Sequence, residues 1–71
     1  MSFIKAQIQE AVDVIDGEGI ELRPFVKQWL AERALSEFGY VPNSDTPDSG
    51  DHALMLDLID QAREMDNKAA A

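Results

Sequence analysis

The stretch that decides the fold is residues 22–38, which read LRPFVKQWLAERALSEF. Pro24 suits the first turn of a helix, where a missing backbone N–H costs nothing, and Gly39 is typical of the position just past a helix end. We therefore expect a helix over residues 22–38. Its apolar side chains spread around most of the circumference instead of forming one stripe: Leu22, Phe25, Val26, Trp29, Leu30, Ala31, Ala34, Leu35 and Phe38. Such a helix is either central to a bundle or shared with a partner.

The residues before this stretch predict an amphipathic helix over residues 2–16. Ser2 can cap its N-terminus, and Gly17 supplies a residue that tolerates positive φ just past its end. Apolar residues recur at helical spacing and gather into one stripe: Ile4, Ile8, Ala11, Val12 and Ile15.

The residues after this stretch predict a long loop, 39–50, and a third helix over residues 50–67. The loop is rich in Pro, Gly, Ser and Asp and has no periodicity, and Tyr40 with Val41 is expected to pack back on the bundle. The helical stripe is expected to comprise Met55, Leu58, Ile59 and Ala62, extended by Leu54 and Met65. Residues 69–71 read as a frayed end or a vector remnant. The chain is thus predicted to be one all-α domain, 1–71, folded as a small three-helix bundle.

Composition narrows the function classes. The 71 residues include 14 acidic and 6 basic side chains, giving a net charge of −8, and no cysteine. Such a charge repels phosphate backbones and anionic membranes, so we expect neither direct nucleic-acid binding nor membrane binding. The absence of disulfides and of any apolar membrane span favours a cytoplasmic protein.

No motif for catalysis or metal binding has the required spacing. His52 is the only histidine, and a transition-metal site usually needs several nitrogen or sulfur ligands. Read as a calcium loop, residues 45–56 place Leu56 where a bidentate Glu is needed. Residues 17–19, Gly-Glu-Gly, lack the preceding strand and third glycine of a phosphate-binding loop. We therefore expect no enzyme activity, no cofactor and no metal.

Two kinds of surface are candidates for partner binding. The helix over 22–38 carries more apolar surface than two amphipathic neighbours should need, in one arc of Leu22, Phe25 and Trp29 and another of Ala31, Leu35 and Phe38. One arc must be core, and the other is either covered by Tyr40 and Val41 or exposed to a partner. The second candidate is an acidic ridge, with Leu56 as an exposed apolar contact beside it: Glu10, Asp13, Asp57, Asp60 and Glu64.

These features predict a protein-binding module whose partner is another protein, basic in character, with a homodimer through the second helix as a further assembly. The small, acidic composition is similar to that of phage-encoded inhibitors that imitate the charge of DNA, and this resemblance implies an inhibitor or modulator of a nucleic-acid-binding protein. Against that, Arg23, Lys27, Arg33 and Arg63 are mixed among the carboxylates. The alternative is a structural or accessory subunit of a homo-oligomer, in which the acidity serves only solubility.

Overall fold

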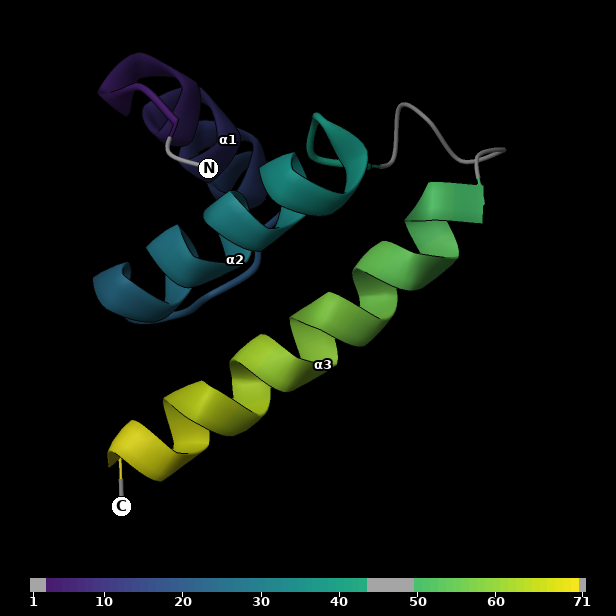
Figure 1. The fold of residues 1–71 in the computed structure, drawn as a ribbon. Coiled ribbons are helices and arrows are strands. Elements are labelled where there is room, and N and C mark those ends of the chain that lie inside the picture. Colours follow the sequence, from purple (N-terminus) through teal and green to yellow (C-terminus); the bar gives the residue numbers. More distant parts are fainter. Residues whose placement is uncertain (1–2, 44–49, 71) are drawn as a thin grey trace.

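The computed structural model describes residues 3–43 and 50–70, which form three α-helices: α1 (Lys5–Gly17), α2 (Pro24–Phe38) and α3 (Gly50–Ala70). The described residues contain no strand, so the prediction of an all-α three-helix fold is confirmed. Figure 1 shows α2 between the other two helices, with α3 running side by side with it in the opposite direction. Among the described residues no helix is long and apolar enough to cross a membrane.

The central position of α2 explains why its apolar residues surround it. It packs against both α1 and α3, whereas no Cα atom of α1 comes within 8 Å of a Cα atom of α3. Val26, Leu30, Ala31 and Ala34 are completely buried because two helices cover different sides of α2. Two neighbouring helices therefore bury most of the apolar surface of α2, although the sequence suggested more of it than they should need. Among the large apolar side chains of α2, Phe25 alone is more than half exposed, at 57%.

The start of α2 differs by two residues from the predicted one. Arg23 is extended, with φ −61° and ψ 151°, and the helix begins at Pro24. The proline ring disfavours helical geometry in the residue before it, so the helix cannot include Arg23. Instead, the Arg23 backbone N–H donates a hydrogen bond of 2.9 Å to Oδ1 of Asp66 on α3.

The connection between α1 and α2 uses a different glycine from the one expected. Gly17 is the last residue of α1, and the positive φ, 75°, occurs at Gly19. The N–H groups of Glu18 and Gly19 still bond to carbonyls of the last helical turn, so the chain reverses only after them. After α2 the prediction is confirmed: Gly39 has φ 79°, and its N–H donates to the Leu35 carbonyl at 2.9 Å.

Among the described residues, no side-chain hydroxyl caps the first turn of α1. The Ile4 backbone N–H donates to Oε1 of Gln7 at 3.2 Å, one turn further along. Ser2, the expected cap, lies outside the described residues.

The third helix runs to Ala70 rather than to residue 67. Residues 69–70 are alanines, the best helix formers, so the helix continues where fraying was expected. The predicted stripe is buried at Met55, Leu58, Ile59 and Ala62, but its extension to Leu54 is wrong because that side chain is 54% exposed. Leu54 is one residue from Met55, about 100° around the helix, and therefore faces a different side.

The chain after α2 packs back on the helices, as predicted. Val41 and Pro42 are buried, and the Tyr40 hydroxyl donates a 3.2 Å hydrogen bond to Oδ2 of Asp51 in the first turn of α3. Together with the Arg23–Asp66 bond at the other end, this contact fixes α2 and α3 as an antiparallel pair. Residues 44–49, half of loop 39–50, lie outside the described residues.

Candidate partner-binding surface

The structure distinguishes the two apolar arcs of α2. In the second arc, Ala31 is completely buried, while Leu35 and Phe38 are partly buried and pack against the core. All three members of that arc are therefore at least partly covered within the chain. In the first arc, Leu22 and Trp29 are partly buried and Phe25 is largely exposed, so this is the arc that reaches solvent.

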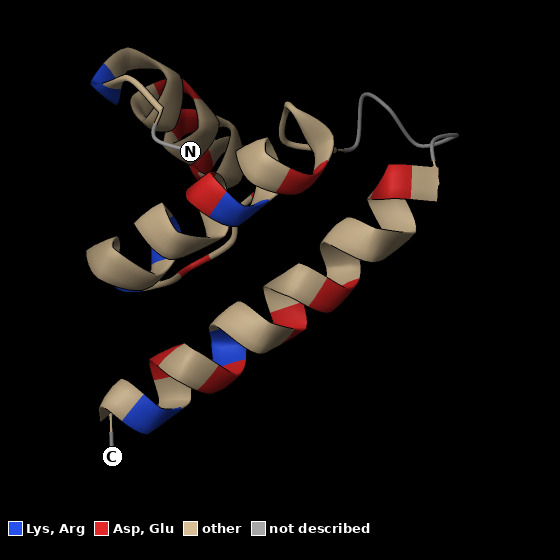
Figure 2. Ribbon diagram, viewed as in Figure 1, with Lys and Arg blue, Asp and Glu red and all other residues tan. Residues whose placement is uncertain are grey.

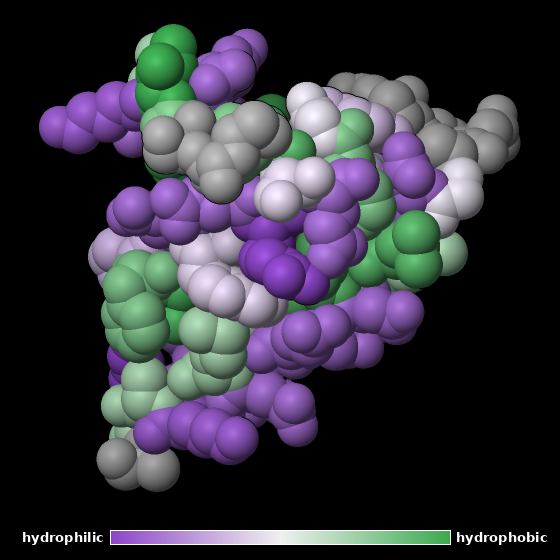
Figure 3. Space-filling model, in the orientation of Figure 1, coloured by the Kyte–Doolittle hydropathy of each residue, from purple (hydrophilic) through white to green (hydrophobic). Residues whose placement is uncertain are grey.

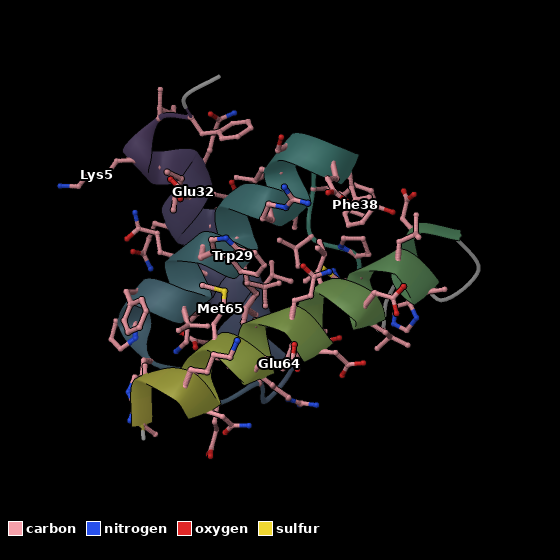
Figure 4. All side chains as sticks on the ribbon, turned by 60° about the horizontal axis from the view of Figure 1, so that its bottom comes forward. Lys5, Trp29, Glu32, Phe38, Glu64 and Met65 are labelled. Atoms are coloured by element: carbon pink, nitrogen blue, oxygen red, sulfur yellow. The ribbon has the colours of Figure 1, made fainter. Side chains whose placement is uncertain are left out.

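The exposed arc continues onto α3. Phe25 and Trp29 are one helical turn apart and therefore lie on the same side of α2. Figure 4 places Trp29 beside Met65 of α3, and both side chains are partly buried against the core. We call these residues the apolar patch: Leu22, Phe25, Trp29 and Met65. In Figure 3, apolar surface covers the start of α2 and the adjoining part of α3, with hydrophilic side chains around it.

The patch is held together by a polar contact at its edge. Asp66, next to Met65, accepts the backbone hydrogen bond from Arg23, next to Leu22, and its carboxylate lies 3.7 Å from the Arg23 guanidinium. The carboxylate also faces the start of α2, where the positive end of the helix dipole favours an anion. This contact joins the α2 and α3 parts of the patch and fixes their relative position.

Carboxylates lie on both helices next to the patch. Glu32 follows Trp29 by three residues on α2, Glu64 precedes Met65 on α3, and both are exposed (Figure 4). Arg33, beside Glu32, is paired with Glu37 one turn further on. Neither Glu32 nor Glu64 forms an ion pair with any described residue. A basic group arriving at the patch therefore meets two available carboxylates.

Cations are less available than their number suggests. Of the 6 Lys and Arg residues, Arg23, Lys27 and Arg33 each form an ion pair within the described part of the chain. These three pairs engage half of the basic side chains and an equal number of carboxylates, so the net charge of −8 is unchanged and is carried by the remaining acidic side chains.

The predicted acidic ridge is two separate surfaces. Asp57, Asp60 and Glu64 are exposed on the solvent side of α3 and form no ion pair with the described residues. Glu10 and Asp13 are exposed on α1, which does not approach α3 (Figure 2). Of these five carboxylates, Glu64, next to Met65, is the one that borders the apolar patch.

Leu56 lies away from the patch. It is 52% exposed, and it is nine residues from Met65, which places the two on opposite sides of α3. Leu56 borders a hollow of about 220 Å³ that it shares with His52, Arg63, Ile20 and Pro42 among others. His52 is half-buried there, and no group of three or more His, Cys, Asp or Glu among the described residues is arranged to hold a metal.

Several members of this surface are missing from the sequence-based prediction. Met65 was expected only as core, Glu32 was not singled out, and the Arg23–Asp66 contact joins residues 43 apart in the chain. The sequence could not predict that Met65 lies beside Trp29 of α2. Helical periodicity shows which residues share a side of one helix, but not which sides of two helices pack together. No protein-family model, no curated protein and no solved structure matches this chain.

Proposed function

We propose that this protein binds another protein through the apolar patch and that the partner is basic. The single observation that carries the proposal is the 57% exposed side chain of Phe25, one helical turn from Trp29, which itself lies beside Met65 and packs against the core. Aromatic side chains that are partly exposed and rigidly supported are typical of the residues that dominate binding energy in protein interfaces.

The charge of the chain supports a basic partner. Glu32 and Glu64 beside the patch are free to pair with Lys or Arg, and the net charge of −8 attracts a basic surface from a distance. Nucleic-acid-binding proteins carry such surfaces, so occupying one of them would make this protein an inhibitor or modulator of nucleic-acid binding. In this role it needs no catalytic group.

A homodimer through the same patch is the competing assembly. Two copies would bring two net charges of −8 together, and this repulsion weakens self-association most at low ionic strength. Sedimentation of the free protein at low and at physiological salt separates the two possibilities, since a basic partner predicts a monomer under both conditions.

The experiment that tests the surface is an affinity purification with wild type, Phe25→Asp and Leu56→Asp as baits. The two variants remove apolar side chains of similar exposure, 57% and 52%, and add the same charge. Phe25 occupies the first turn of α2, where an added carboxylate is favoured by the helix dipole, so the fold should survive, as circular dichroism can verify. The bound partner should be lost with Phe25→Asp, by roughly tenfold or more, and retained with Leu56→Asp. Loss with Leu56→Asp alone would place the interface on the opposite side of α3.

A further inference from the structure

We infer that the partner contributes a basic amphipathic helix, which lies along the seam between α2 and α3. This inference rests on the proposed function and adds the form and the chemistry of the bound element. It begins from the arrangement of α2, which already has helices on two sides. The side with the apolar patch is the one that remains open, and a third neighbouring helix would cover it as α1 and α3 cover the others.

A second exposed apolar side chain extends the patch along the seam. Leu54 is 54% exposed and lies eleven residues before Met65 in α3. Eleven residues are just over three turns, so Leu54 and Met65 lie on nearly the same side of α3, about 16 Å apart along its axis. The open surface therefore has apolar contacts at both ends: Phe25, Trp29 and Met65 at one end and Leu54 at the other.

A bound helix can match this spacing. A bound helix that runs along α3 presents side chains of one face at i, i+4 and i+11, which span the same distance. Between the two apolar ends the exposed residues are polar, including Glu32 on α2 and Gln61 on α3. An amphipathic helix with long basic side chains along its flanks can reach Glu32 on one side and Glu64 on the other.

The probe for this inference is a synthetic peptide of about 15 residues, roughly the length of α2, with Leu at i, i+4 and i+11 and Lys on the flanks. It contains no Trp, so Trp29, the only tryptophan of the protein, reports its binding by fluorescence. One control peptide has the same composition with the Leu positions scrambled, and another has Glu in place of Lys.

The matched protein variants are Leu54→Asp and Leu56→Asp, which are close in sequence and similar in exposure but face different sides of α3. We expect the Lys peptide to change Trp29 fluorescence, and Leu54→Asp to weaken its binding by about tenfold, the loss typical of an interface anchor. Leu56→Asp should change the affinity less than about twofold, as is usual outside an interface.

The other outcomes overturn the inference in distinguishable ways. If Phe25→Asp abolishes binding while Leu54→Asp has no effect, the patch binds its partner but the bound element does not follow the seam. Equal binding of the Glu peptide would show that the bound element is not selected by basic charge. A patch-dependent dimer of the free protein would identify a second copy as the occupant. No Trp29 response to any peptide, together with full partner capture by Phe25→Asp, would overturn both the inference and the proposed function.

Discussion

The contact between Asp66 and Arg23 leads to a prediction that separates a backbone hydrogen bond from an ion pair. Asp66→Ala removes the acceptor of the Arg23 backbone N–H and the carboxylate at the start of α2, whereas Arg23→Ala removes only the guanidinium. The two variants therefore affect different parts of one contact.

The hydrogen bond and the ion pair are expected to contribute different free energies to stability. A hydrogen bond to a charged acceptor contributes about 1.5–3 kcal/mol, and the Asp66 side chain is 25% exposed, so we take the lower half of that range, about 1.5–2 kcal/mol. The guanidinium lies 3.7 Å away and is 40% exposed, and such pairs contribute about 0.5 kcal/mol or less. For a domain of this size each kcal/mol corresponds to roughly 4–8 °C in Tm. Asp66→Ala should thus lower Tm by about 6–16 °C and Arg23→Ala by no more than about 4 °C.

The assay is thermal and urea unfolding followed by circular dichroism at 222 nm, with Asp66→Asn as a third variant. Asparagine keeps an oxygen acceptor for the N–H but loses the charge, so its midpoint should fall between those of wild type and Asp66→Ala. An unchanged urea slope would verify that the same surface unfolds in each variant. Equal losses for Asp66→Ala and Arg23→Ala would refute the reasoning, because they would assign the stabilisation to the ion pair.

Three further predictions concern the core, the turns and the partner. Leu30→Ala, at a completely buried position of α2, should cost about 2–5 kcal/mol in urea unfolding, and a smaller loss would mean that the core collapses around the cavity. Gly39→Ala should cost about 1–2 kcal/mol because φ is 79°, although no atom obstructs the added methyl group. Gly17→Ala, at a helical position that is equally open, should instead stabilise the protein by about 0.5–1 kcal/mol. If both substitutions changed the free energy of unfolding in the same direction, the assigned backbone geometry would be contradicted. Affinity for a basic partner should fall between about 50 and 200 mM salt, and a flat response would show that charge does not guide binding.

The sequence alone determined the helical class of this chain. Apolar residues at helical spacing, Pro24 and Gly39 act within one or two turns of the backbone, so their effects can be predicted without knowing the rest of the fold. The same local character explains why the buried stripe of α3 was predicted from Met55 to Ala62.

Tertiary structure alone decided which faces meet. The periodicity around Leu54 and Leu56 shows that they face different sides of α3. Only the position of α2 decides which sides of α3 are buried. The two arcs of α2 were equivalent in the sequence, and only the placement of α1 and α3 on different sides of α2 leaves Phe25 largely exposed. Likewise, helical spacing places Asp66 on the same side of α3 as Ala62, but it does not show that the start of α2 lies against it, because a contact between residues 43 apart depends on the packing of whole helices and not on local backbone preference.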